Sequence, residues 1–269
     1  MFSKGYGFAD LENRIPMDPA TSLHRPGSNS KLLVWLAVMQ LMEQGRLELY
    51  TDSNNYLDFS LPSKLASGKE VPPITLHHLM THTAGFEDEL SFVIVSEPSQ
   101  IKPLGQYVQE HLPARVFTPG AVMAYSNYGT ALAAYIVELV SGQPFFEYVE
   151  ENILQPLEMS STTLVQPVPE HLLDRLSEGY RRAEGTFLPG GFEYLQNYPA
   201  GGLTSSALDM ARLMIAQLNL GLVSTDTDNS QIEEEEIEEL PTVRILQEET
   251  ARLMQAQQFA GHPEIPGMT

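Results

Sequence analysis

The strongest restriction on the fold comes from one apolar segment, residues 28–44. From residue 32 to residue 42, every side chain except Gln40 is apolar. A helix with apolar residues on all sides has no face that prefers water, so it is buried in the centre of a domain. Gly45 follows the segment and is typical of the residue that ends a helix. We therefore expect a buried central helix around which the rest of the chain packs.

Weaker periodic patterns predict five more helices, while strand patterns are few. In the segment 205–218, the polar residues Asp209, Arg212 and Gln217 are expected to mark the solvent face. Residues 4–10 alternate small and aromatic side chains and favour a strand that runs into a turn. The predicted helices are residues 74–80, capped by Thr75, and residues 125–140, 144–154, 205–218 and 246–258.

Composition excludes several classes of protein. The formal net charge is −20 and the chain has no cluster of lysine and arginine for phosphate binding, so nucleic acid is not an expected partner. The absence of cysteine excludes disulfides, thiolate metal ligands and a cysteine nucleophile. No apolar run is long enough to cross a bilayer. Residues 224–240 have eight acidic residues and no basic one. We expect a disordered acidic loop there, with an acidic metal or partner site as the alternative.

A serine and a lysine, Ser28 and Lys31, stand three residues apart at the start of the central segment. On a helix this spacing brings both side chains to one face. A serine hydroxyl needs a base to become a nucleophile, and burial lowers the pKa of a lysine so that it acts as that base. The helix N-terminus also favours the negative charge that develops during acyl transfer. The alternative is a capping serine beside a lysine whose amine reaches solvent.

A tyrosine and an asparagine, Tyr125 and Asn127, form the second motif further along the chain. A tyrosine hydroxyl held near an ammonium group loses its proton more easily, and it then shuttles protons between the serine and a leaving group. An asparagine side chain donates to a substrate amide. The alternative interpretation is a pair of turn residues at a helix N-terminus.

Together these motifs resemble the serine β-lactamase and penicillin-binding-protein family, which includes class C β-lactamases, D,D-carboxypeptidases and related esterases. The order Ser-x-x-Lys followed by Tyr-x-Asn is that of the family. Other stretches are similar to family sequences, so the resemblance extends over nearly the whole chain. These stretches are residues 5–10, 79–86 and 198–207.

The resemblance implies an α+β fold of the β-lactamase/transpeptidase type, as a single, partial hydrolase domain over residues 1–269. Residues 1–20 would supply a sheet-side strand, and residues 21–260 a mainly helical region. The third motif of the family, Lys-Thr-Gly or His-x-Gly on a strand that lines the site, has no match in the chain. We therefore expect the helical part to be largely present and the antiparallel sheet to be incomplete, as in a segment shortened at both ends.

The resemblance also implies roles for the motif residues. Ser28 would be the acylated nucleophile, Lys31 its general base or the cation that tunes it, Tyr125 the proton shuttle, and Asn127 a substrate-amide contact. The division of base duty between Lys31 and Tyr125 stays open. One oxyanion N–H is expected from Ser28 and the other from the strand with the third motif. Losing one such donor lowers the rate by about a hundred- to a thousandfold, so residues 1–269 alone are expected to be a poor enzyme.

The expected function is that of a serine hydrolase that acts through an acyl-serine intermediate on D-alanyl peptides, β-lactams or small esters. The expected partner is a small-molecule or peptide substrate, with no cofactor and no metal. The family implies a location outside the cytoplasm, although the sequence begins with no signal segment, and membrane association is expected only through flanking sequence. The alternative is a catalytically inactive binding or scaffold protein on the same fold.

A cluster of histidines gives a second enzymatic alternative, a metallohydrolase. His78 and His82 are spaced one helical turn apart, with His77 beside them. A zinc protease of this pattern needs a glutamate directly after the first histidine, and Leu79 stands there instead. Such histidines are more typical of loop and cap positions than of a metal site.

Overall fold

The computed structural model describes residues 2–88, 90–91, 93–223 and 243–260. The acidic segment 224–240, for which the sequence predicts a disordered loop, lies outside these residues. None of the described helices is long and apolar enough to span a membrane. The described helices are α1 (Lys31–Glu43), α2 (Leu76–Met80), α3 (Leu104–Glu110), α4 (Asn127–Ser141), α5 (Phe145–Val149), α6 (Glu170–Leu173), α7 (Ala207–Leu218) and α8 (Glu248–Gln255).

The strands of the described residues form three small antiparallel sheets of two strands each. Of the predicted strand over residues 4–10, only residues 8–10 form a strand, β1. The sheets therefore cover little of the helices, and the described part of the chain is mixed helix and sheet with helix dominant. The pairs are β1 (Phe8–Asp10) with β2 (Ile15–Pro16), β3 (Ile94–Val95) with β6 (Tyr194–Leu195), and β4 (Tyr180–Ala183) with β5 (Thr186–Pro189).

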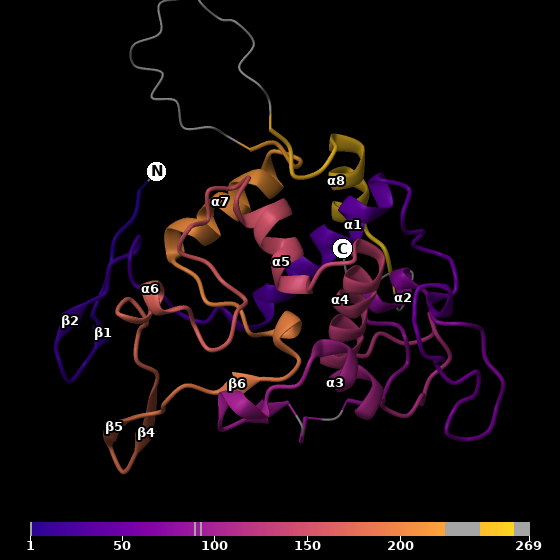
Figure 1. The fold of residues 1–269 in the computed structure, drawn as a ribbon, viewed down its shortest axis with the longest axis horizontal. Helices are drawn as coiled ribbons and strands as arrows, with labels where there is room; N and C mark the ends of the chain where they lie inside the picture. Colours follow the sequence, from indigo (N-terminus) through magenta and orange to yellow (C-terminus); the bar gives the residue numbers. More distant parts are fainter. Residues whose placement is uncertain (1, 89, 92, 224–242, 261–269) are drawn as a thin grey trace, which may run out of the picture.

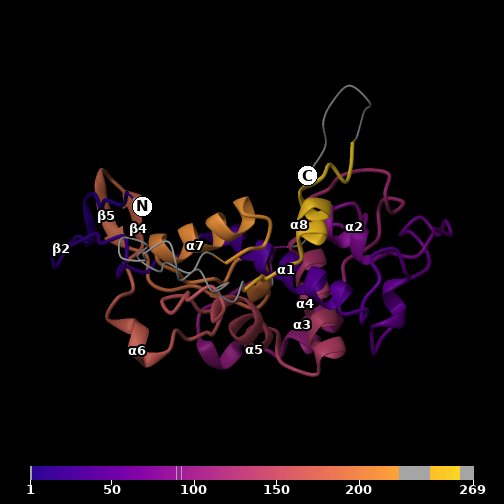
Figure 2. The same cartoon turned by 90° about the horizontal axis from the view of Figure 1, so that it is seen from above.

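The helices α1, α4 and α5 form the centre of the molecule (Figure 1). The hairpins β1–β2 and β4–β5 lie at one end, and α2 lies toward the other end in both views (Figures 1 and 2). The main hydrophobic core contains residues from α1 to α5 together with α7 and α8, so one continuous core joins segments from most of the described chain.

The prediction of a buried central helix is confirmed by α1, most of whose apolar side chains are buried, while Leu32, Trp35 and Met42 are partly buried. This helix packs against α4, α5 and α8. Its end is as predicted: Gly45 adopts a φ of +68° and donates its N–H to the carbonyl of Met42 at 2.9 Å. Its polar exception, Gln40, is also buried, and its side-chain amide donates to the carbonyls of Asn152 and Ile245 at 3.0 and 2.9 Å.

The helix predicted to start at Tyr125 starts two residues later. Ser126 is the N-cap of α4, because its hydroxyl accepts a hydrogen bond from the Gly129 N–H at 2.9 Å. Tyr125 therefore lies in the extended segment that leads into the helix. At the other end, Gly142 adopts the left-handed conformation that is common where a helix ends.

The prediction that Asp209 marks the solvent face of α7 is wrong. Asp209 is buried, and its carboxylate accepts hydrogen bonds from the Ser161 N–H and the Thr162 hydroxyl, both at 2.8 Å. It also forms an ion pair with Arg212 at 3.3 Å. The preceding Ser206 caps the helix and places the carboxylate in its first turn. A buried carboxylate is tolerated when it is hydrogen-bonded and paired in this way.

Candidate active site

Ser28 lies in a tight 3₁₀ turn, Gly27–Ser30, that leads directly into α1. Gly27 has a φ of +60°, a conformation that glycine adopts without steric cost. The fully buried Ser30 fixes the turn, because its hydroxyl donates to the Gly27 carbonyl at 2.6 Å and accepts from the Leu203 N–H at 3.1 Å. Ser28 itself is exposed. A hydrogen-bonded turn, anchored by the buried Ser30, thus presents an accessible serine hydroxyl.

The amine of Lys31 is the point at which the predicted site residues meet. Lys31 is only 4% exposed. Its amine lies 3.2 Å from the Ser28 hydroxyl oxygen, 2.8 Å from Asn127 Oδ1 and 2.6 Å from the Ala200 carbonyl oxygen. It also lies 4.8 Å from the centre of the Tyr125 ring. The structure therefore brings the serine, lysine, tyrosine and asparagine of the two motifs into one group.

Burial changes the acid–base behaviour of Lys31. Loss of solvation lowers the pKa of its amine, while the Tyr125 hydroxyl and, more weakly, the Asp88 carboxylate oppose that effect. The uncharged form of the amine is therefore more accessible near neutral pH than in an ordinary lysine. An uncharged amine within hydrogen-bond distance of a serine hydroxyl has the geometry and the chemistry to accept its proton.

Tyr125 and Asn127 flank the cap of α4, and this local structure sets their directions. Asn127 is the first residue of the helix and directs its side-chain oxygen at the Lys31 amine. Tyr125 lies just before the helix and is 45% exposed, with its ring against the same amine. Tyr125 is therefore open to a substrate on one side and faces the lysine on the other.

The Ala200 carbonyl is a part of the site that the sequence motifs did not indicate. Ala200 is buried in a short 3₁₀ helix, Tyr198–Ala200, and its carbonyl accepts the shortest hydrogen bond that the Lys31 amine makes. The family-like stretch 198–207 includes this residue, but side-chain patterns carry no information about a backbone acceptor. Close packing of Gly202 against Tyr198 shapes the turn, since a Cβ at residue 202 would lie 2.9 Å from the Tyr198 Cβ.

Of the three histidines of the metallohydrolase alternative, His77 and His78 lie with their ring centres 6.1 Å apart, and each of the three has a further partner of its own. Thr75 is the N-cap of α2, as predicted: its hydroxyl accepts the His78 N–H at 3.3 Å, and the His78 Nδ1 accepts the Thr75 N–H at 3.1 Å. His77 packs against the Tyr50 ring at 5.0 Å. The Nδ1 of His82 accepts the Ser126 N–H at 3.2 Å. Within the described residues, no three histidine, aspartate or glutamate side chains are grouped so that they could hold a metal ion.

His82 is 3% exposed, and burial together with the nearby Lys31 charge lowers its pKa to about 4. The unfolded chain, with the ordinary value of 6.5, binds a proton more readily. We therefore expect the contribution of His82 to the free energy of unfolding to be constant above about pH 6.5 and to fall by as much as roughly 3 kcal/mol as the pH drops to 4. Urea unfolding at a series of pH values measures this effect.

The control for this prediction is the variant His82→Asn, which removes the titrating ring. Its stability should depend much less on pH in the same window. His77 and His78 also have pKa values lowered by burial, so a smaller dependence of the same sign should remain. Equal pH dependence in the variant and the unmodified chain would show that His82 titrates normally in the folded protein.

The family model described as Beta-lactamase matches residues 1–261 of the chain. Two curated proteins are similar over most of it. PbpX of Bacillus subtilis (strain 168), whose name places it among penicillin-binding proteins, is 29% identical over 214 residues, which are 77% of this chain and 49% of PbpX. Protein flp of Staphylococcus aureus (strain MW2) is 25% identical over 222 residues, which are 81% and 43% of the two chains. The chain spans about half the length of the curated relatives it matches.

Solved structures resemble the whole described arrangement. An octameric penicillin-binding protein homologue from Pyrococcus abyssi has a TM-score of 0.73 at 23% identity, covering 99% of this chain and 56% of its own. A penicillin-binding protein from Bacillus halodurans has a TM-score of 0.70 at 24% identity, covering 97% and 72%. EstCE1, described as a hydrolase with promiscuous acyltransferase activity, has a TM-score of 0.73 at 25% identity, covering 97% and 71%.

Proposed function

Because the chain belongs to the beta-lactamase family and has the β-lactamase/transpeptidase-like fold expected from its motifs, we propose that it is a serine hydrolase in which Ser28 forms the acyl-enzyme. The family and the structural neighbours are of the serine hydrolase type. One observation carries the proposal for this chain: the buried Lys31 amine lies within hydrogen-bond distance of the exposed Ser28 hydroxyl.

The proposed acylation step begins when a base removes the proton of the Ser28 hydroxyl. The oxygen attacks the substrate carbonyl carbon, and the tetrahedral intermediate then expels its leaving group, which takes up a proton. The Lys31 amine lies 4.8 Å from the centre of the Tyr125 ring, and the Tyr125 hydroxyl acts on the pKa of that amine, which supports sharing of these proton transfers between the two residues. Water subsequently attacks the acyl-serine, releases the acid product and restores the serine hydroxyl.

Asn127 is proposed to act on both the lysine and the substrate. Its side-chain oxygen accepts a hydrogen bond from Lys31, so the amide nitrogen is the group that remains to donate to a substrate carbonyl. The Ser28 N–H, at the start of the turn that leads into α1, is proposed as one oxyanion donor. The second donor is assigned to the third motif, for which this sequence has no match.

The proposed substrates are D-alanyl peptides, β-lactams or small esters, all of which react with serine by acyl transfer. The names of PbpX and of EstCE1 support this range, since one refers to penicillin binding and the other to acyl transfer. The exposed position of Ser28 and the partly exposed Tyr125 leave room for an acyl donor of any of the three classes.

The test is covalent labelling of Ser28. Purified protein should react one to one with a fluorophosphonate or a fluorescent penicillin, and peptide mass spectrometry should place the adduct on Ser28. Ser28→Ala should abolish labelling, whereas Ser3→Ala, in an exposed position near the N-terminus, should leave it unchanged. Absence of labelling in a folded sample would favour the binding or scaffold alternative. Fast ester turnover by residues 1–269 would contradict the expectation of a poor enzyme.

A further inference from the structure

One histidine outside the two motifs contacts three successive residues around the proposed proton shuttle. The backbone carbonyl of His82 accepts the Ala124 N–H at 2.8 Å. Its Nδ1 accepts the Ser126 N–H at 3.2 Å. Its ring packs on the Tyr125 ring, with 4.5 Å between the ring centres. A single buried side chain and its own backbone thus hold the residue before the tyrosine, the tyrosine itself and the residue after it.

The backbone conformation of His82 suits this arrangement. Its φ is +55°, in the left-handed region that costs energy for most residues and that asparagine and histidine adopt more readily than most. This conformation lets the carbonyl and the ring of His82 both face residues 124–126. A residue in a strained conformation at the edge of a reactive site is a reason to look for a functional role.

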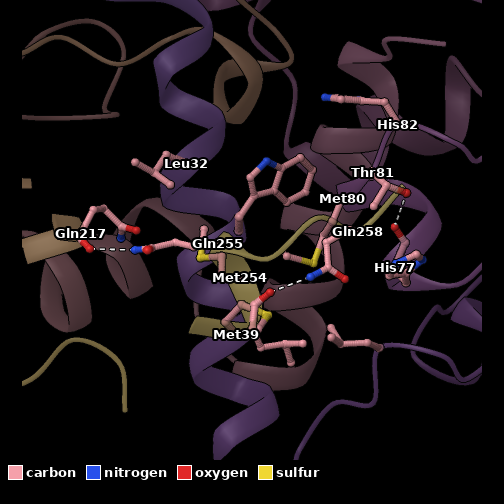
Figure 3. A pocket seen from close by; sticks show the side chains of 13 residues that line it. Leu32, Met39, His77, Met80, Thr81, His82, Gln217, Met254, Gln255 and Gln258 are labelled. Carbon is pink, nitrogen blue, oxygen red and sulfur yellow. Dashed lines mark hydrogen bonds between the residues drawn. The ribbon is translucent and has the colours of Figure 1, made fainter. Parts of the chain in front are cut away.

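The other side of the ring is supported by the central helix. Trp35, one turn after Lys31 on α1, meets the His82 ring edge-on with 6.0 Å between the ring centres. His82 also borders a cavity of about 290 Å³ lined with Leu32 and Met80, and Figure 3 shows it at the edge of that space. The ring therefore fills the gap between the central helix and Tyr125. Removing it would enlarge the cavity toward the tyrosine.

We propose that His82 is a positioning residue that holds Tyr125 against the Lys31 amine, and the proposal rests on the acyl-transfer function argued above. His82 does not reach the serine in this role. It acts through Tyr125, and only in its neutral form, because its Nδ1 must accept the Ser126 N–H. The depressed pKa of His82 is consistent with that requirement, since burial and the Lys31 charge both disfavour a second proton.

The variant His82→Asn tests the ring. Asparagine tolerates the left-handed conformation and offers an oxygen in place of Nδ1, so the chain should still fold. We expect the second-order rate of Ser28 acylation by a fluorophosphonate to fall between about tenfold and a hundredfold, because displacing a reacting group by an ångström has effects of that size. His77→Asn is the matched control: it borders the same cavity without touching residues 124–126, and it should acylate at the normal rate.

A double-mutant cycle separates positioning from a general structural effect. In a Tyr125→Phe background the hydroxyl that His82 would position is absent, so adding His82→Asn should change acylation by less than about twofold. A purely structural role predicts that the two losses multiply. Multiplying losses, or normal acylation in His82→Asn alone, would overturn the proposal.

A spectroscopic measurement tests the contact without any activity. In ¹⁵N-histidine NMR of the folded protein at pH 7, the signal that disappears in His82→Asn should be that of a neutral ring with an unprotonated Nδ1. A protonated Nδ1 would overturn the positioning role whatever Ser28 does. The two failures can be told apart. If the NMR signal shows an unprotonated Nδ1 but Ser28 in the unmodified chain is never acylated, the labelling experiment shows that the proposed function is wrong, and the positioning role of His82 is then wrong as well.

Discussion

Replacing Lys31 by methionine should lower the rate of Ser28 acylation by about a hundred- to ten-thousandfold, the range expected when a general base is lost. Methionine fills a similar volume in the buried site but accepts no proton. The Asn127 oxygen and the Ala200 carbonyl lose a donor, which costs stability, while removal of a buried cation offsets part of that cost. Stopped-flow or gel-based labelling with a fluorophosphonate measures the rate, and circular dichroism checks the fold.

Lys31→Arg is the matched control, since arginine keeps the positive charge but does not lose its proton in proteins. In the unmodified chain, acylation should increase with pH as the base loses its proton, and the midpoint of the increase should lie below the ordinary lysine pKa of 10.5 because burial lowers the pKa of Lys31. The arginine variant should be slow at every pH. Near-normal acylation in both variants would assign the base duty to Tyr125 rather than to Lys31.

Replacing Phe145 by alanine should lower the free energy of unfolding by about 3–5 kcal/mol, because deleting a fully buried aromatic ring removes apolar burial and leaves a cavity. Phe145 is 0% exposed and its ring packs near the Tyr198 ring at 6.3 Å. Tyr198 belongs to the same 3₁₀ helix as Ala200, so the loss should also loosen the carbonyl that holds Lys31. Urea unfolding gives the stability, and the labelling rate of the folded protein reports on the site.

Phe187→Ala is the control for this prediction, because Phe187 lies in β5 and is 60% exposed. Its effect on the free energy of unfolding should stay within about 0.5 kcal/mol. A comparable loss in the two variants would mean that the region around α5 is not the packed core described here. If Phe145→Ala loses much stability while the dependence of its free energy of unfolding on urea concentration keeps the same slope, the substitution has changed stability without changing the surface exposed on unfolding.

Much of the fold could be predicted because the signals for it are local. The apolar composition of residues 32–42 is enough to predict a buried helix, and Gly45 and Gly142 mark two helix ends by their conformational freedom. The start of α4 lies two residues after the predicted start because the Ser126 hydroxyl caps the helix, so the first helical residue is Asn127. Asp209 is predicted to be exposed because a charged residue on an amphipathic helix normally faces solvent. Its burial depends on Ser161 and Thr162, which are distant in the sequence.

In the candidate site, too, the features set by local sequence could be predicted and those set by distant contacts could not. Ser28 and Lys31 could be paired from sequence, since a separation of three residues places two side chains on one side of a helical turn. Tyr125 and Asn127 were suggested by their order in the chain and by resemblance. The Ala200 carbonyl and the contacts of His82 were not predicted, because a backbone acceptor and a left-handed turn leave no pattern of side chains to read.

The sequence by itself determined that a buried helix would form the centre of this protein and that a serine and a lysine would share its first turns. Both follow from local chemistry, namely the solubility of side chains and the geometry of a helix. Only the tertiary structure decided that Asn127 and Ala200, which are 96 and 169 residues from Lys31 in the chain, would meet at its amine. That meeting depends on how α1, α4 and the 3₁₀ helix pack together, and packing is a property of the whole core.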